Sequence, residues 1–465
     1  MNVNSHTGPH RLGADDTSRL TWLRRHGRDA VSFQALKLDA EWWVDAPPPT
    51  GTGAAVAYQP SGLSWIAIGA PLVAADRRAE AVRGFCRAAR AEGRRPVFLG
   101  VEEVDSFAGL RTLALGLQSV LKPSVWDATL RRWPKLREQV RRARAKGVTV
   151  RAVEPDELAP GAPLRADVER LRGEWLRSRA MEPLGFLVEV NPCYAAAEHL
   201  YFAAYHQGRA VQFLSVVPIY ARDGWLMEDM LRGKDAPNGT TELLIAALMQ
   251  RLGGDPAWVT PGLTPLAGDV AWWLRLTRLV TVALYDFSGL LRFRSRLHPS
   301  AWTTVWLAWD RGPAPLVLLD VLGAFARGRI LRFAVRSTTW HPNGPPWTVA
   351  VPLVVWTAVL FVLALTGQTG VLGYPLANLY GWILFDVALA WALFAVARRP
   401  RPLALAAVAT VALVDFALAT RHTEVIGMGT GIVQPLCRAI SVAGPLLGAA
   451  AVYWAAWLAY RKANR

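Results

Sequence analysis

Four apolar runs distinguish the last quarter of the chain, at residues 349–366, 377–397, 403–419 and 439–460. Each is close to the ~20 residues that an α-helix needs to cross the hydrocarbon core of a bilayer. Few charged residues remain in this region to form a solvated outer face. The pattern therefore predicts an α-helical transmembrane bundle of about four helices within residues 347–465, in preference to buried helices of a soluble domain.

Basic residues give this bundle an orientation. Arg398, Arg399 and Arg401 lie between the second and third runs, and Arg461 and Lys462 follow the fourth. Cytoplasmic loops of membrane proteins carry an excess of Lys and Arg. We therefore expect a multi-pass protein of the inner (plasma) membrane, with its soluble body and its C-terminus in the cytoplasm.

Two carboxylates interrupt the apolar runs, Asp386 in the second and Asp415 in the third. A carboxylate at that depth is costly unless it faces a partner or water. It either forms an interhelical pair or lines a polar site for a lipid headgroup, and the pattern leaves both open. Upstream, residues 315–346 begin apolar and end rich in arginine, which predicts an interfacial helix and a linker.

The first two thirds of the chain alternate strand-like and helix-like patterns twice, after a flexible tail at residues 1–25. The first set has strands at 54–58, 64–68 and 96–101 and a helix at 76–92; the second has helices at 194–204 and 240–252 and strands at 210–217 and 226–231. The repetition predicts two similar α/β lobes. We place them at residues 26–160 and 161–314.

Residues 131–147 predict a helix with one apolar stripe, formed by Trp133, Leu136, Val140 and Ala143. Its other faces are almost uniformly basic, with Lys135, Arg137, Arg141 and Arg144 among eight cations against the lone Glu138. A solvated helix usually mixes charges of both signs. A polyanion partner is therefore expected, either RNA phosphates or anionic lipid headgroups.

Composition and motif content limit which metal or cofactor sites the chain could contain. The 465 residues include 52 Lys+Arg against 36 Asp+Glu, a formal charge of +16, with only 3 Cys. The isolated cysteines supply neither a metal site nor a disulfide framework. No phosphate-binding GxxxxGK[ST] loop and no GxGxxG turn after a strand is present, so we expect no metal and no cofactor.

Four segments in order resemble the bacterial phosphatidylglycerol lysyltransferases, the multiple peptide resistance factor family. They are the basic helix with KLR and RAKG, WLRSRAMEPLGF at 175–186, EDMLR followed by DAPNG at 228–239, and GLLRFRSRLHP at 289–299 with Trp302. The resemblance covers roughly residues 26–330. It implies tandem acetyltransferase-like (GNAT) lobes that esterify a lipid hydroxyl with an amino acid taken from aminoacyl-tRNA, without a cofactor. In this chain the apolar helices follow the catalytic body, where the best-known members have them before it.

The resemblance also implies a site. Asp229 would bind the ammonium groups of the aminoacyl moiety, and Arg232 would hold a phosphate or the developing oxyanion. Glu182 is a second carboxylate for a cationic side chain, while Arg294 and Arg296 would bind terminal tRNA phosphates or the lipid phosphate. On a regular strand Asp229 and Arg232 would point to opposite faces, so a bend or bulge is needed for both to line one pocket.

Three functions remain open. The first is a membrane-anchored lipid aminoacyltransferase with aminoacyl-tRNA and an anionic phospholipid as partners, phosphatidylglycerol lysyltransferase-like, whose product would confer resistance to cationic antimicrobial peptides. The second is a GNAT acyltransferase that uses acyl-CoA, and the third is a non-catalytic, membrane-tethered module that binds RNA or lipid. The sequence does not indicate the oligomeric state, the amino acid or the acceptor lipid.

Overall fold

The computed structural model describes residues 10–11, 16–37, 40–45, 53–179, 184–254, 257–275, 287–329, 353, 357, 376–398, 402–425 and 452–453. The chain divides into two compact units. The larger comprises residues 1–179 and 183–330, and the smaller comprises residues 331–465 with 180–182. Of the predicted site residues, Glu182 lies outside the described residues.

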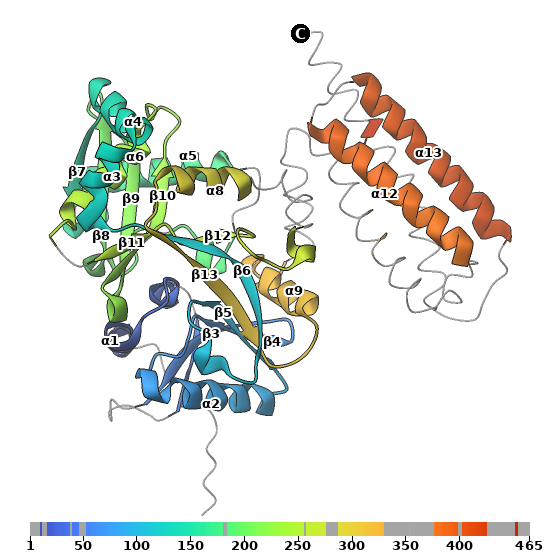
Figure 1. Ribbon diagram of the computed structural model, residues 1–465, viewed down its shortest axis with the longest axis horizontal. Coiled ribbons are helices and arrows are strands. Elements are labelled where there is room, and N and C mark those ends of the chain that lie inside the picture. The colour runs from blue at the N-terminus through green and yellow to red at the C-terminus, as the bar shows by residue number, and fades with distance from the viewer. Residues whose placement is uncertain are drawn as a thin grey trace, which may run out of the picture. The chain divides into compact units, whose positions relative to one another are not determined.

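The larger unit contains two β-sheets (Figure 1). The first has eight strands in the order β1-β2-β3-β4-β5-β13-β6-β12. Their bounds are β1 His10–Arg11, β2 Glu41–Val44, β3 Ala55–Ser61, β4 Ser64–Ile68, β5 Arg95–Val101, β6 Arg111–Val120, β12 Leu263–Pro265 and β13 Ala301–Trp309. β4 and β5 are parallel, and β13 inserts between β5 and β6 as an antiparallel strand.

The second sheet has five strands in the order β11-β10-β9-β8-β7. Their bounds are β7 Thr149–Val153, β8 Leu200–His206, β9 Arg209–Ile219, β10 Gly224–Arg232 and β11 Trp258–Thr260. The sheet is antiparallel except for the β10–β11 pair. A single bridge between Leu121 and Val259 connects it to the end of β6.

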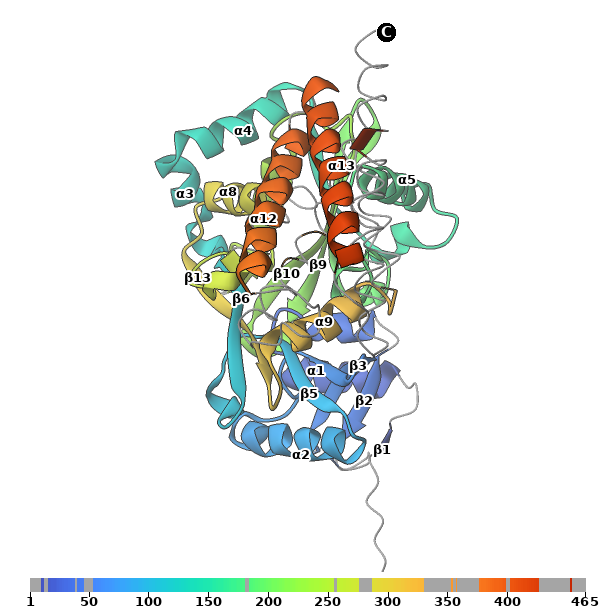
Figure 2. The same cartoon turned by 90° about the vertical axis from the view of Figure 1, so that its right-hand side faces the viewer.

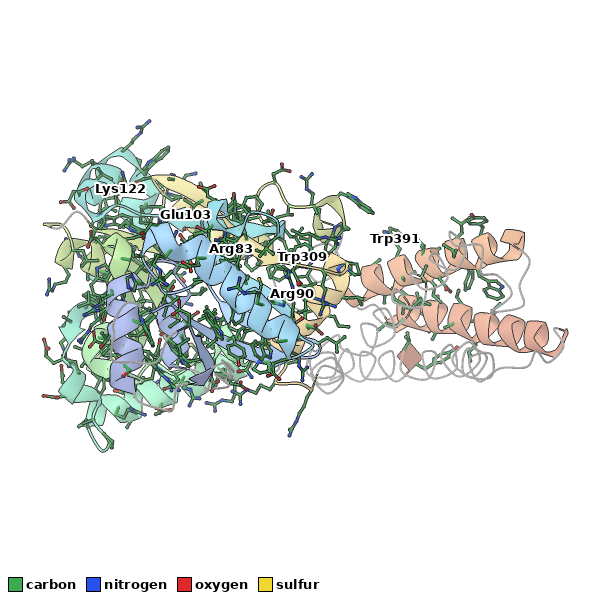
Figure 3. The ribbon with its side chains drawn as sticks, turned by 90° about the horizontal axis from the view of Figure 1, so that it is seen from below. Arg83, Arg90, Glu103, Lys122, Trp309 and Trp391 are labelled. Atoms are coloured by element: carbon green, nitrogen blue, oxygen red, sulfur yellow. The ribbon has the colours of Figure 1, made fainter. Side chains whose placement is uncertain are left out.

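Helices cover both faces of each sheet. Their bounds are α1 Asp16–His26, α2 Arg78–Ala91, α3 Trp126–Arg132, α4 Pro134–Ala145, α5 Pro163–Arg177, α6 Thr240–Arg251, α8 Phe287–Arg296 and α9 Ala314–Phe325. α2 and α9 pack on opposite faces of the first sheet (Figure 2), and α5 packs on the face of the second sheet opposite α4 and α6. Figure 3 shows Arg83 and Arg90 along α2, whose apolar residues Phe85 and Ala89 are buried.

Most predicted elements of the body are present, with several corrections. Residues 16–25 of the predicted flexible tail belong to helix α1, where Leu23 is buried, and the start of the predicted interfacial helix at 315–346 is α9, which packs on the first sheet through Val317 and Val321. The predicted helix at 194–204 is instead a turn with a short 3-10 helix at Ala196–Glu198, followed by the start of strand β8 at Leu200, because the apolar run from Tyr201 is buried in the sheet core, where periodicity does not separate helix from strand. The predicted helix at 131–147 is two helices that meet at Trp133, because Pro134 cannot donate a backbone hydrogen bond and opens α4. The two sheets also do not follow the predicted boundary at residue 160: β7 joins the second sheet, whereas β12 and β13 join the first.

In the smaller unit, α12 spans Leu376–Arg398 and α13 spans Pro402–Val425, at the second and third predicted apolar runs. Leu389 and Leu393 of α12 pack against Leu405 and Ala409 of α13. Over the described ranges, none of the helices meets both the length and the hydropathy that a membrane span requires. The first and fourth runs lie almost entirely outside the described residues.

Asp386 of α12 is buried, and the Thr357 hydroxyl donates to its Oδ2 at 3.4 Å. An interhelical polar contact was one of the two roles expected for this carboxylate. The side chain of Asp415 lies outside the described part of the chain.

Candidate functional site

A β-bulge in β10 brings two carboxylates to one face of the second sheet. The β9–β10 register shifts between Met227 and Asp229, so Glu228 has no opposite residue on β9. An extra residue of this kind places two successive side chains on the same side of a strand. Glu228 and Asp229 therefore point together toward the first lobe.

Glu228 is the centre of a buried polar cluster. Its carboxylate lies 3.3 Å from Lys37 Nζ, and it accepts hydrogen bonds from the Tyr194 hydroxyl at 3.0 and 3.1 Å and from Gln34 Nε2 at 3.2 Å. His199 Nε2 is 3.7 Å away. Only 1% of the Glu228 side chain is exposed. Because Gln34 and Lys37 come from the first lobe, this cluster joins the two lobes.

Lys37 also faces Asp229, with 3.9 Å between Nζ and Oδ2. The Lys37 side chain is 1% exposed and that of Asp229 is 7% exposed. Within the described ranges Asp229 Oδ2 accepts no hydrogen bond. One buried ammonium group is therefore shared between two buried carboxylates, and one carboxylate oxygen is left for a further donor.

The two neighbouring carboxylates differ in their pKa. Burial, reinforced by the charge of Glu228 and opposed by Lys37, raises the pKa of Asp229 to about 7. Burial acts in the same direction on Glu228, but His199, Lys37 and Tyr194 outweigh it and hold its pKa below the usual value. Pairs whose environments push their pKa values apart can provide one permanent anion and one proton acceptor near neutral pH.

Arg232 lies on the other face of the strand. The bulge precedes Asp229, so the chain from Asp229 to Arg232 keeps the alternation of a regular strand. Leu231 packs with the core beneath α5, whereas Met230 packs toward α4 and α6. The exposed Arg232 donates to the carbonyl oxygen of Ala236 at 2.7 Å. Asp229 and Arg232 consequently neither line a shared pocket nor form an ion pair with each other.

The two arginines of α8 have different environments. Arg294 is buried, and its guanidinium donates to Thr264 Oγ1 at 2.7 Å and to the carbonyl oxygens of Gly262 and Pro261. These bonds fasten α8 to the connection between β11 and β12, in place of the phosphate contact expected for Arg294. Arg296 is exposed.

The basic face of α4, defined as Lys135, Arg137, Arg141 and Arg144, is exposed throughout. Leu136, Val140 and Ala143 are buried against the second lobe, as the stripe predicts. Trp133 departs from the stripe: it is 39% exposed and stacks on His298. Glu138 pairs with Arg141 and Arg142. A single carboxylate does not balance the many cations of this helix, so the face keeps a large excess of positive charge.

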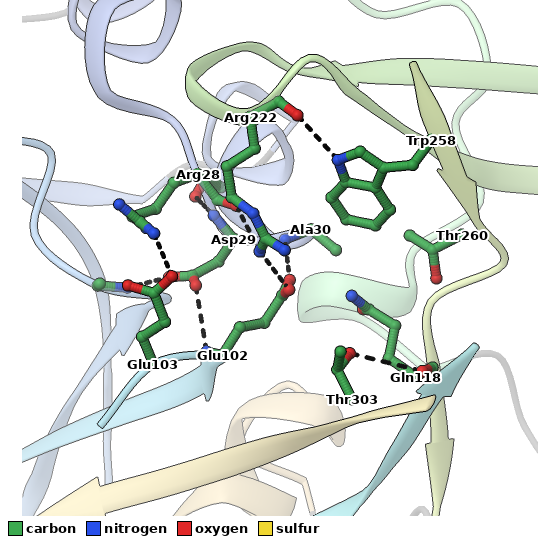
Figure 4. A network of polar contacts seen from close by, with 12 residues as sticks. Arg28, Asp29, Ala30, Glu102, Glu103, Gln118, Arg222, Trp258, Thr260 and Thr303 are labelled. Carbon is green, nitrogen blue, oxygen red and sulfur yellow. Dashed lines mark hydrogen bonds and ion pairs between the residues drawn. The ribbon is translucent and has the colours of Figure 1, made fainter. Parts of the chain in front are cut away.

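A second buried network joins the lobes near Asp29 (Figure 4). Asp29 accepts backbone hydrogen bonds from Ala70 and Glu102, and burial together with the charge of Glu102 raises its pKa to about 6. Glu102 in turn accepts from Arg222 at 2.6 Å, and the Arg222 guanidinium lies over the ring of Trp258. These contacts hold the first lobe against the strand turn that precedes β10.

Sequence reasoning missed Lys37, Tyr194, His199 and Glu228. Glu228 adjoins Asp229 inside a recognised segment, and it could have been found by asking what a bulge there would expose. No local signal marks the other three, because distant segments bring them together. Among the residues described, no group of three or more His, Cys, Asp and Glu side chains could hold a metal ion.

Comparisons with solved structures agree on the fold. The structure of L-PGS from Bacillus licheniformis aligns with a TM-score of 0.58 at 20% identity, over 67% of this chain and 97% of that one. The C-terminal domain of a putative lysylphosphatidylglycerol synthetase from Agrobacterium fabrum aligns with a TM-score of 0.56 at 22% identity, over 68% and 98%. The predicted α/β body is therefore confirmed.

Sequence comparisons point the same way. The lysylphosphatidylglycerol biosynthesis bifunctional protein LysX of Mycolicibacterium gilvum is 29% identical over 250 residues, and that of Mycolicibacterium vanbaalenii is 28% identical over 243. Each match covers 51% of this chain and only 21% of the relative. A family model described as phosphatidylglycerol lysyltransferase, C-terminal, matches residues 21–309. The chain thus belongs to the family of phosphatidylglycerol lysyltransferase C-terminal domains.

Proposed function

We propose that this protein transfers an amino acid, lysine or a similar one, from aminoacyl-tRNA to a hydroxyl group of an anionic phospholipid such as phosphatidylglycerol. The observation that carries the proposal is the buried Asp229, which the β10 bulge places beside Lys37 and Glu228 in a chain of this family. The reaction exchanges one ester for another, so it needs no cofactor.

In the proposed reaction the lipid hydroxyl oxygen bonds to the carbonyl carbon of the aminoacyl ester, and the bond from that carbon to the ribose oxygen breaks. Ionised Asp229 takes the proton of the lipid hydroxyl and returns it to the leaving ribose oxygen. A pKa near 7 suits a group that must accept and release a proton at neutral pH better than it suits a permanent anion. Bringing the two substrates together supplies a further ~7–11 kcal/mol.

The surrounding residues support this role. Glu228 stays ionised and shares the ammonium group of Lys37. Lys37 therefore stabilises the ionised form of Asp229 less than it would if Asp229 were its only partner. Because little of Asp229 is exposed, the reacting ester must replace contacts at the junction of the lobes. We assign Arg232 to a substrate phosphate outside this cluster, since it is exposed on the opposite face. Glu182 stays a candidate partner for a cationic amino-acid side chain.

The remaining partners are proposed from charge and hydropathy. The basic face of α4 would hold tRNA phosphates, whose negative charge it complements. Residues 347–465 would anchor the protein in the inner (plasma) membrane, with the body and C-terminus in the cytoplasm beside the acceptor lipid. The expected product makes the envelope less negative and so favours resistance to cationic peptides.

A reconstituted reaction tests the proposal. The full chain in detergent is mixed with phosphatidylglycerol vesicles and radiolabelled lysyl-tRNA or alanyl-tRNA, and lipids are extracted for mass spectrometry. We expect an aminoacyl-lipid that disappears when the tRNA is first digested with RNase. Product formation from acetyl-CoA instead of aminoacyl-tRNA would identify a GNAT acyltransferase, and no product from either donor would leave a non-catalytic binding module.

A further inference from the structure

An aromatic pair, of which Trp133 is exposed and His298 is half-buried, lies beside the basic face of α4. Trp133 occupies the joint between α3 and α4, and its ring stacks on the imidazole of His298 with 3.8 Å between centroids and 2° between planes. The guanidinium of Arg132 lies 5.6 Å from the same indole. Two planar groups and a cation therefore meet at the surface of the second lobe, where α4 and the end of α8 approach each other.

The Trp133–His298 contact is not needed to attach the end of α8 to the core. The adjacent Leu297 is 1% exposed and already anchors the end of α8 in the core. His298 instead adopts φ +51°, a left-handed conformation that costs non-glycine residues roughly 1–2 kcal/mol. Burial lowers the pKa of His298, which favours the uncharged imidazole. The result is a flat, neutral ring pair that is held at the surface although a buried anchor is present next to it.

The surroundings are suited to a nucleic acid more than to a bilayer. A helix that lies on a membrane keeps its apolar side free for lipid, whereas Leu136, Val140 and Ala143 of α4 are committed to the core. What remains exposed is cationic along α4 and aromatic at its start. Stacked aromatic rings flanked by Arg and Lys are how proteins hold unpaired nucleotides, because every base offers a flat face.

The position within the lobe indicates which nucleotides. α4 packs directly on the start of α6, where a Cβ at Gly239 would lie 2.1 Å from the carbonyl oxygen of Gln139. α6 follows β10, the strand that carries Asp229, after one short loop. The aromatic pair is thus in the lobe that supplies the proposed reaction centre, on the face of the sheet covered by α4 and α6, whereas Asp229 lies on the face covered by α5. The reactive ester of an aminoacyl-tRNA is on its unpaired 3′ end, and in this arrangement that end passes the edge of the sheet to reach Asp229.

We propose that the Trp133–His298 pair is a stacking platform for an unpaired nucleotide near the 3′ end of tRNA, while the basic face of α4 holds the phosphates of the adjoining stem. This deepens the function proposed above and rests on it for the identity of the RNA. The platform supplies affinity that depends on the single-stranded end, and the basic face supplies affinity that depends on salt.

The test compares two RNAs that differ only at this end. Binding of the full chain in detergent is measured by fluorescence anisotropy with an intact tRNA and with the same tRNA lacking its four unpaired 3′ nucleotides. For Trp133→Ala we expect Kd for intact tRNA to rise about tenfold, within the range of base stacking, and Kd for trimmed tRNA to change less than twofold. His298→Ala should show a smaller change of the same kind, and Trp133→Phe should retain most of the affinity.

Trp272→Ala is the matched control, because Trp272 is 71% exposed elsewhere on the same unit. It should leave both affinities unchanged. The slope of log Kd against log salt should be unaffected by Trp133→Ala, since a neutral ring releases no counterions.

Equal losses for intact and trimmed tRNA, or no loss for either, would overturn the platform. Weaker binding of Trp133→Ala to phosphatidylglycerol vesicles, with unchanged tRNA binding, would assign the pair to the membrane instead. The transferase proposal and the platform proposal can be contradicted independently of each other. End-dependent binding without an aminoacyl-lipid product contradicts the transferase, while product formation by Trp133→Ala with unaltered Kd and KM for tRNA contradicts only the platform.

Discussion

Two charged regions of the larger unit use similar residues in opposite environments. At the β10 bulge, Lys37, Glu228 and Asp229 are withdrawn from water, and each is within 4 Å of another charge. On α4, Lys135, Arg137 and Arg144 are open to solvent. Desolvation strengthens each interaction of the first group and shifts its pKa values, whereas water and salt screen the second. One region is therefore suited to proton transfer and the other to holding a polyanion.

The largest effect is expected from Asp229→Asn, which keeps the shape of the side chain and removes the proton acceptor. General-base catalysis typically contributes ~10²–10⁴-fold, so aminoacyl-lipid formation should fall by that factor. Lipid mass spectrometry after timed reactions measures the loss. Asp156→Asn, at an exposed carboxylate, is the matched control and should be fully active. Normal activity of Asp229→Asn would show that the buried cluster does not supply the proton acceptor.

Lys37→Met tests whether the buried cluster holds the lobes together. Losing the ammonium group leaves two buried carboxylates without their shared cation, which should lower the free energy of unfolding by about 3 kcal/mol. Urea unfolding of the full chain in detergent measures this. Lys122→Met changes an exposed lysine, labelled in Figure 3, and should stay within 0.5 kcal/mol of the parent, roughly the range of neutral surface substitutions. Equal changes in the free energy of unfolding for Lys37→Met and Lys122→Met would mean that the buried lysine contributes no more to stability than an exposed one.

The pH dependence should show which carboxylate titrates. Asp229 must be ionised to accept a proton, so kcat/KM should rise with pH and level off above about 7. The same raised pKa makes the folded state bind more protons than the unfolded state between the ordinary Asp value and about 7, so this group's contribution to stability declines as pH rises through that window. A rate profile that is flat from pH 5 to 8 would contradict the assignment.

Arg141→Ala combined with Arg144→Ala should weaken tRNA binding several-fold at low salt. The slope of log Kd against log salt should decrease by about 1.4–1.8, as expected when two phosphate contacts are lost. The folded state should be nearly unaffected, because both side chains are exposed. Arg83→Ala with Arg87→Ala, on the exposed side of α2, makes the same charge change elsewhere and should not alter the slope.

An effect on binding alone, much smaller than that of Asp229→Asn, is expected from Arg232→Ala. Loss of a phosphate contact outside the buried cluster should raise KM for one substrate by roughly tenfold or less. The kcat should be preserved, because such a contact binds the substrate and the transition state equally. Steady-state kinetics with each substrate varied in turn will show the difference. A fall in kcat comparable to that of Asp229→Asn would instead return Arg232 to the reacting atoms.

Local patterns gave much of the body correctly. β9, β10 and α6 fall where alternation and helical spacing placed them, and the apolar side of α4 is buried as predicted. The region before β9 was misread because β8 is buried on both faces and shows no alternation. Arg294 was expected to bind phosphate, yet its guanidinium is used within the protein, since sequence does not show which arginines turn inward.

The sequence alone determined the α/β class, the family motifs, the basic face of α4 and the position of Asp229 on a strand, because each depends on residues within about 20 positions of one another. Only the tertiary structure decided which charges meet. A one-residue bulge turned Glu228 and Asp229 to the same side and left Arg232 on the other, and the packing of the lobes brought Lys37 across nearly two hundred residues of chain. Desolvation at that junction, which no local pattern encodes, then set the pKa of Asp229 near neutrality.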